Sequence, residues 1–243
     1  MKKGAIRGLL LYLLAQAACS LPPGVEPKAD QILSEMSQYM GGLKEFTFHS
    51  EVTMEDTVSG MQVDVCTESD TYVRRPDGIR VTRKGDKGNQ EAFYDGKQLT
   101  LFNASKNFYA QSAVPSTIEP MLDFAHEKLG MVFPLADLLF ANPHDVLSKD
   151  TDVGFYAGEH EVGGVLCDHL AFSQPSGLEW QIWVEQGAMR VPRKLVIRRP
   201  EEPGSPRFQA VFSRWDKAPK IAADQFHFVA PQGALKIDFK GNK

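Results

Sequence analysis

Three side chains of the kind that bind metal ions lie close together in the second half of the chain. His160, Cys167 and His169 flank Gly163-Gly164. If the two glycines form a two-residue turn, His160 lies opposite Cys167, and His169 lies diagonally on the same face. Imidazole and thiolate groups bind zinc and copper. A half-exposed hairpin explains the same pattern without a metal. We favour that interpretation, because a metal site also needs groups that orient its ligands. We predict neither metal nor cofactor.

A second candidate for chemistry is a cysteine near the start of the chain. Lys2, Lys3 and Arg7 precede an apolar run over residues 8–14, and small residues lead from there to Cys19. This three-part pattern is typical of a bacterial export signal. We therefore predict that the chain is exported to the periplasm.

Two cleavage sites remain open within this signal. Ala15-Gln16-Ala17 suits an ordinary signal peptidase, whereas Ala17-Ala18-Cys19 resembles a lipobox, in which Cys19 becomes the lipidated first residue. Gln16 stands where a Leu-like residue is usual. We predict a signal peptide over 1–18 and a tether over 19–26. Lipidation of Cys19 would anchor the protein to the outer membrane. We expect no other membrane attachment, because no later segment has the ~20 apolar residues of a spanning helix.

Signatures of catalysis are missing from the sequence. It has no Gly-x-Ser-x-Gly elbow, phosphate-binding loop or CxxC motif, and His126-Glu127 lacks a second histidine at zinc spacing. The acidic pairs Glu55-Asp56 and Glu68-x-Asp70 are typical of solvated turns. We predict no catalytic residue and no enzymatic activity.

The net charge of the chain argues against two classes of partner, nucleic acids and anionic membrane surfaces. The formal charge of the 243 residues is −4, which argues against nucleic acid. Cleavage before Cys19 removes Lys2, Lys3 and Arg7 and leaves −7. A chain of that charge is not drawn to anionic membrane surfaces.

Hydrophobic periodicity predicts a mainly β, α+β protein. Apolar residues at helical spacing predict helices over 27–40, 117–129 and 134–140, with another turn over 143–148. Alternating segments between residues 45 and 115, and again after residue 149, predict strands with one buried face. The final strand is expected at Phe226–Val229, before a loose tail over 231–243.

A single antiparallel sheet with the helices against one face accounts for this order of elements. We therefore predict one domain over 27–230. A split at residue 115 into two domains is the alternative. It is less favoured, because each half has too little helix to cover its own sheet.

The helices that cover the apolar face leave two functions open. If they cover it tightly, the protein is an envelope scaffold or sensor that binds only other proteins. If they act as a movable lid, the space beneath can hold an acyl chain, and each buried methylene contributes ~0.8 kcal/mol.

Four segments carry a resemblance to a known family. Residues 74–81 and 93–102 combine an Arg-Pro strand with an Asp-Gly-Lys hairpin, and 162–172 and 180–185 are two later strands. The first two resemble the LolA/LolB/LppX-like superfamily of periplasmic lipoprotein carriers. All four are similar to a family of predicted periplasmic proteins, domain of unknown function 2092, over about 27–230. The resemblance implies an open, LolA-like β-half-barrel whose helices cover an apolar concave face, and the non-enzymatic binding of a lipid, acyl chain or acylated lipoprotein.

We accordingly predict an apolar site between helices and sheet, with a lipid or lipoprotein as partner and envelope proteins as further partners. Its candidate residues are apolar and lie on the predicted lid or the predicted concave face: Met36, Met40, Phe46, Phe48, Leu99, Leu101, Met121, Leu122, Phe124, Leu138, Leu139, Trp180 and Ile182.

Overall fold

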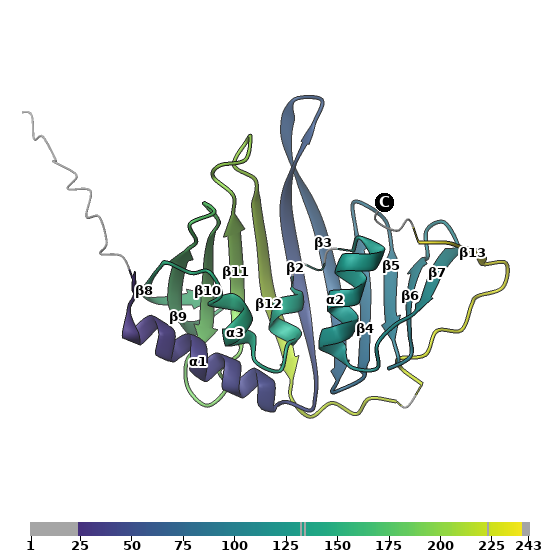
Figure 1. Ribbon diagram of the computed structural model, residues 1–243, viewed down its shortest axis with the longest axis horizontal. Coiled ribbons are helices and arrows are strands. Elements are labelled where there is room, and N and C mark those ends of the chain that lie inside the picture. The colour runs from purple at the N-terminus through teal and green to yellow at the C-terminus, as the bar shows by residue number, and fades with distance from the viewer. Residues whose placement is uncertain (1–23, 132, 134, 223, 240–243) are drawn as a thin grey trace, which may run out of the picture.

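One continuous sheet of thirteen strands forms the body of the protein (Figure 1). The computed structural model describes residues 24–131, 133, 135–222 and 224–239. The spatial order of the strands is β1-β8-β9-β10-β11-β12-β2-β3-β4-β5-β6-β7-β13. Their bounds are β1 Gly24–Val25, β2 Glu45–Val58, β3 Met61–Arg74, β4 Gly78–Gly85, β5 Gln90–Tyr94, β6 Gln98–Asn103, β7 Phe108–Ala113, β8 Val153–Val162, β9 Val165–Ser173, β10 Glu179–Glu185, β11 Pro192–Arg198, β12 Arg207–Asp216 and β13 Leu235–Ile237.

The sheet is open rather than closed into a barrel. All neighbours from β8 round to β7 pair antiparallel, whereas the two end strands, β1 and β13, add to β8 and β7 in parallel. The predicted antiparallel half-barrel with helices over its concave face is therefore confirmed.

The helices lie on one side of the sheet (Figure 1). They are α1 (Pro27–Gly42), α2 (Ile118–Leu129), the 3-10 helix η1 (Ala136–Leu139) and α3 (Pro143–Leu147). α2 ends as predicted at Gly130, whose φ of 66° is left-handed. α1 continues through Gly41, where the sequence predicted a stop. A side chain at this position would collide with the backbone of Ala141, so the glycine permits close packing rather than ending the helix.

The core lies between the helices and the concave face. Successive side chains of a strand point to opposite faces, so alternate residues of each strand face the helices. The buried positions of α1 follow helical spacing, as Ile32, Leu33, Met36 and Met40 show. They join the concave residues of the sheet in one continuous cluster.

The C-terminal segment departs from the prediction. Phe226–Val229 is not a strand, because its aromatic side chains pack onto the sheet instead of pairing with it. Phe228 contacts the rings of Phe93, Phe102 and Tyr109 at centroid distances of 5.0–5.5 Å. These three residues alternate with the concave ones, so the segment crosses the convex face. It then adds β13 within the tail that was expected to be loose.

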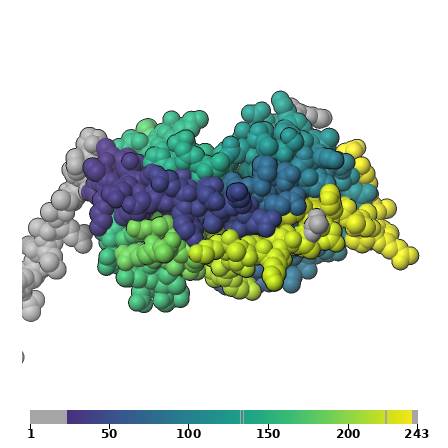
Figure 2. All heavy atoms as spheres, turned by 90° about the horizontal axis from the view of Figure 1, so that it is seen from below, coloured from purple at the N-terminus to yellow at the C-terminus, as the bar shows by residue number. Residues whose placement is uncertain are grey.

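The C-terminal segment and α1 run along the same lower edge of the molecule (Figure 2).

Among the described residues, none of the helices has both the length and the apolar character of a membrane-spanning helix. The predicted signal peptide (1–18) and Cys19 lie outside those residues. The predicted tether (19–26) enters them at residues 24–26, of which Gly24–Val25 form β1.

Candidate functional site

The two halves of the concave face are covered differently. In the half formed by β8–β12 the inward side chains are large, and α1 packs directly on them. Phe172 and Trp180 stack with ring centroids 4.1 Å apart, and Leu170 and Ile182 beside them have no exposed surface. The inward side chains of this half are therefore buried directly against α1.

A cavity of about 640 Å³ lies in the other half, between β2–β7 and the helices α2 and η1. Its volume is in the range of small-ligand sites, roughly 300–1,000 Å³. Most of its lining is apolar. Besides Phe48, Leu99, Leu101, Met121, Leu122 and Leu139, the apolar lining includes Val52, Met54, Ile79, Val81, Ala92, Tyr94, Phe108, Ala110, Met131, Phe133, Leu135, Phe208 and Ile237.

Short side chains midway along β3–β7 create this space. Thr71, Val81, Ala92, Leu101 and Ala110 follow one another across β3–β7 as directly paired residues. Only one of the five is larger than valine. The side chains of α2 and η1 therefore leave part of the space above this row unfilled.

A polar row runs parallel to this one, on the same face. Its members are paired in register across β2–β6: Ser50, Ser69, Arg83, Gln90 and Asn103. All five line the cavity. The cavity therefore has an apolar interior and one polar strip across its wall.

The cover of the cavity is fixed to the rim of the sheet by an arginine. Arg75 donates hydrogen bonds from Nη1 to the carbonyl oxygen of Leu139 (2.6 Å) and from Nη2 to that of Phe140 (3.0 Å). Burial lowers the pKa of this guanidinium from its ordinary value. These bonds hold the end of η1, whose Leu139 side chain closes the cavity.

The structure gathers six of the thirteen predicted site residues around the cavity: Phe48, Leu99, Leu101, Met121, Leu122 and Leu139. Another six are buried in the core: Met36, Met40, Phe46, Leu138, Trp180 and Ile182. Phe124 is half-buried on α2 and belongs to neither group.

The polar row was missed in the sequence, because its residues are spread over five strands. Alternation along each strand indicates which side chains share a face. Which residues become neighbours depends on the register between strands, and no motif in this chain records that register. The paired positions of Ser69 and Arg83, for example, are 14 residues apart.

The predicted hairpin register is confirmed, since His160 pairs with Cys167. The His169 ring stacks on Trp183 at 3.9 Å, and Nε2 of His169 donates to Gln181 Oε1. The Cys167 thiol donates to the carbonyl oxygen of Val165, and burial raises its pKa to about 11. Among the described residues, no three His, Cys, Asp or Glu side chains are grouped to hold a metal ion.

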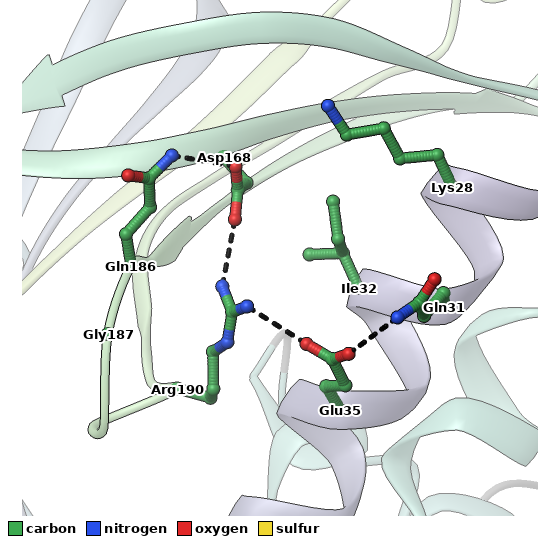
Figure 3. Close-up of a pocket in the computed structure, with 8 residues that line it drawn as sticks. All are labelled: Lys28, Gln31, Ile32, Glu35, Asp168, Gln186, Gly187 and Arg190. Atoms are coloured by element: carbon green, nitrogen blue, oxygen red, sulfur yellow. Dashed lines mark hydrogen bonds and ion pairs between the residues drawn. The ribbon is translucent and has the colours of Figure 1, made fainter.

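A smaller polar hollow lies between α1, β9 and the loop that follows β10 (Figure 3). Arg190 bridges Glu35 of α1 (2.9 Å) and the nearly buried Asp168 of β9 (2.8 Å). Asp168 also accepts hydrogen bonds from Gln186 and Tyr156. Because the charged groups satisfy one another, the hollow is best described as a clamp that ties α1 to the sheet.

Comparisons with solved structures concern the fold. An uncharacterised conserved protein from Thermus thermophilus superposes with a TM-score of 0.50 at 12% identity, over 87% of this chain and 99% of that one. LprF from Mycobacterium bovis gives 0.49 at 13% identity, over 86% and 99%. The LolA superfamily protein NE2245 from Nitrosomonas europaea gives 0.42 at 10% identity, over 82% and 97%.

No curated protein matches the sequence. One family model does, over residues 29–240, which is most of the chain, and it is described as a predicted periplasmic protein. The family resemblance seen in the sequence is thereby confirmed. The chain belongs to the DUF2092 family of predicted periplasmic proteins.

Proposed function

We propose that the protein binds an apolar ligand in the periplasm without transforming it, the ligand being a lipid, an acyl chain or the acyl group of a lipoprotein. The observation that carries this proposal is the cavity of about 640 Å³ beneath α2 and η1. Few soluble proteins keep a space of this size lined by Leu, Met, Phe and Val unless something fills it.

The lining favours binding over catalysis. Among the described residues that form it, the charged ones are Arg83, Glu91 and Asp238, and no His or Cys is present. Glu91 is paired with Arg80 at 2.7 Å, and Asp238, beyond β13, has no His or Cys of the lining to act with. A group that could activate water or attack an ester is not assembled there.

Periplasmic location rests on the family description and on the predicted signal over 1–18. Anchoring at the outer membrane rests on Cys19 alone.

Metabolic labelling with a fatty-acid probe tests whether Cys19 is lipidated: the natural chain should take up label and Cys19→Ser should not. Absence of label from the natural chain would contradict anchoring and leave a periplasmic protein that moves freely.

Ligand uptake by delipidated protein tests the binding proposal. A Leu101→Trp variant places an indole in the middle of the cavity, whereas Leu166→Trp adds the same group at an exposed position on the hairpin of β8 and β9. We expect the natural chain and Leu166→Trp to bind long-chain lipids, and Leu101→Trp to bind at least tenfold more weakly. Failure of all three to bind any fatty acid, phospholipid or lipopeptide would contradict the proposal. It would favour the alternative, an envelope scaffold or sensor whose partners are proteins.

A further inference from the structure

Arg83 is a charged residue in the wall of an apolar cavity. It is half-buried on β4, between Ser69 of β3 and Gln90 of β5. Within the part of the chain that the structure describes, no carboxylate lies within ion-pair distance of its guanidinium, whereas Arg74, Arg80, Arg190 and Arg193 all have such partners. A partly desolvated guanidinium without a counter-ion is costly, and an anion beside it removes that cost.

The other charged residues of the lining do not supply this counter-ion. Glu91 points to the opposite face and is bound to Arg80. Asp238 follows β13, and three strands, β5, β6 and β7, separate that strand from β4.

A buried hydroxyl in the same row also lacks a partner. Ser50 is 1% exposed, lines the cavity, and its Oγ has no hydrogen-bond partner among the described residues. It pairs with Ser69, which pairs with Arg83, so the backbones of Ser50 and Arg83 lie two strand spacings apart, about 10 Å. Buried polar atoms are normally satisfied, so one aimed into a cavity indicates a ligand atom or water that bonds to it.

Along the adjacent strands β4, β5 and β6, the solvent exposure of the residues increases towards the polar row. On β4 it rises from the buried Ile79 to the half-buried Arg83 and the exposed Lys84. On β5 it rises from the buried Tyr94 to the exposed Gln90, and on β6 from the buried Leu99 to the half-buried Asn103. The part of the polar row on β4–β6 therefore lies at the open side of the cavity, whereas its Ser50 end is buried, and the apolar residues lie beneath α2.

We infer that the ligand is an amphiphile with an anionic head group, held at Arg83 and its polar row, and with its acyl chain directed toward Ile79, Leu99 and α2. This inference rests on the proposed function and narrows it. The head group is a carboxylate or a phosphate ester, since the guanidinium fork binds either through two parallel hydrogen bonds. A neutral lipid would leave the charge of Arg83 unpaired.

The test compares three ligands with similar chains, each used at a concentration at which it is monomeric: palmitate, palmitoyl lysophosphatidylglycerol and 1-hexadecanol. The proteins are the delipidated natural chain, Arg83→Gln, Arg83→Lys and a control, Lys84→Gln. Lys84 neighbours Arg83 in sequence but is exposed on the opposite face of β4, so this control removes the same charge outside the cavity.

We expect the natural chain to bind at least one of the two anionic ligands more tightly than hexadecanol, and the tighter one identifies the head group. Arg83→Gln should weaken anion binding about 10- to 100-fold, the range expected when a hydrogen bond to a charged group is lost, and leave hexadecanol within twofold. Arg83→Lys should retain most of the preference, and Lys84→Gln all of it.

Two results would overturn the inference in distinguishable ways. If Arg83→Gln weakens all three ligands equally, or none, the cavity binds lipid but Arg83 does not select an anion, and the proposed function stands. If the natural chain binds none of the three, the inference fails, and the proposed function fails with it if diacyl phospholipids and lipopeptides do not bind either. Circular dichroism of each variant establishes that it is folded.

Discussion

Single side chains decide whether the space above the sheet is filled. Leu170 of β9 and Leu101 of β6 both face the helices, but Leu170 is fully buried beneath α1, whereas Leu101 lines the cavity. The same substitution at these two positions therefore has different consequences.

We predict that Leu170→Ala lowers the free energy of unfolding by about 2–5 kcal/mol, because it opens a new cavity in a packed region. Leu101→Ala should cost roughly 1 kcal/mol, since it enlarges a space that already exists. Urea unfolding followed by circular dichroism measures both. Equal losses would show that the region around Leu101 is as tightly packed as that around Leu170.

The two described cysteines differ in environment and should differ in reactivity. Both are free, with Cys66 exposed on β3 and Cys167 buried on β9, so the sheet order keeps the two thiols from forming a disulfide. Burial raises the pKa of Cys167 from its ordinary value of 9.0 to about 11. We expect a maleimide at pH 7.5 to label Cys66 rapidly and Cys167 only after unfolding, because the thiolate is the reactive form. Rapid double labelling of folded protein would contradict this.

The same shift predicts a pH dependence of stability. Below pH 9 the Cys167 thiol is protonated in both the folded and the unfolded chain, so its contribution is fully present. Between about pH 9 and pH 11 the unfolded chain loses the proton while the folded chain keeps it, and stability falls. Over this range Cys167→Ala should lose less stability than the natural chain, with Cys66→Ala as the matched control. Identical slopes in all three proteins would contradict a buried, protonated thiol.

At the scale of elements, α1 is held by charge as well as by its apolar face. Arg190 joins Glu35 to Asp168, and only 9% of the Asp168 side chain is exposed. We predict that Arg190→Met lowers the free energy of unfolding by about 2 kcal/mol, because the buried carboxylate loses a charged hydrogen bond. Arg199→Met is the control, since its partner Glu202 is on the surface. If both variants lose the same small amount, the clamp contributes nothing measurable.

The sequence predicted the positions of helices and strands better than it predicted the contacts between them. Helical spacing located α1 and α2 closely, and alternation located most strands, because both periods are recorded in consecutive residues. Phe226–Val229 shows the limit of this reasoning. Its alternation is that of a strand, but Phe226 is buried against Gly78 and Phe228 lies on three rings of the convex face. Tertiary packing, which no local pattern encodes, decided its conformation.

At the scale of the whole molecule, the C-terminal segment links the centre of the sheet to its far edge. It leaves β12, crosses the convex face and ends in β13 beside β7 (Figure 1). We predict that Phe226→Ala lowers the free energy of unfolding by about 3–5 kcal/mol, since the ring is 1% exposed. Val229→Ala, at a side chain that is 83% exposed, should change it by less than about 0.5 kcal/mol. Comparable effects at both positions would show that the segment is not packed on the sheet.

Six of the thirteen predicted residues line the cavity, but most of its lining residues were not predicted, and the reason lies in how the site is built. The apolar lining belongs to strands and helices whose inward faces are visible as periodicity. The cavity itself depends on small residues such as Ala92 and Ala110 becoming neighbours, and on α2 standing off from them. The net charge of −4 also gives no indication of Arg83, because the charge of the whole chain does not describe one guanidinium inside a cavity.

The central claim is that the space beneath α2 and η1 holds an apolar ligand. Native mass spectrometry tests it most directly, with the mature protein exported by its own signal and purified without detergent. We predict a non-covalent added mass in the range of a lipid on the natural chain, absent or strongly reduced on Leu101→Trp. A bare chain mass for the natural protein, under conditions that retain lipid on a known lipid-binding protein, would contradict the account and favour a scaffold that binds other proteins.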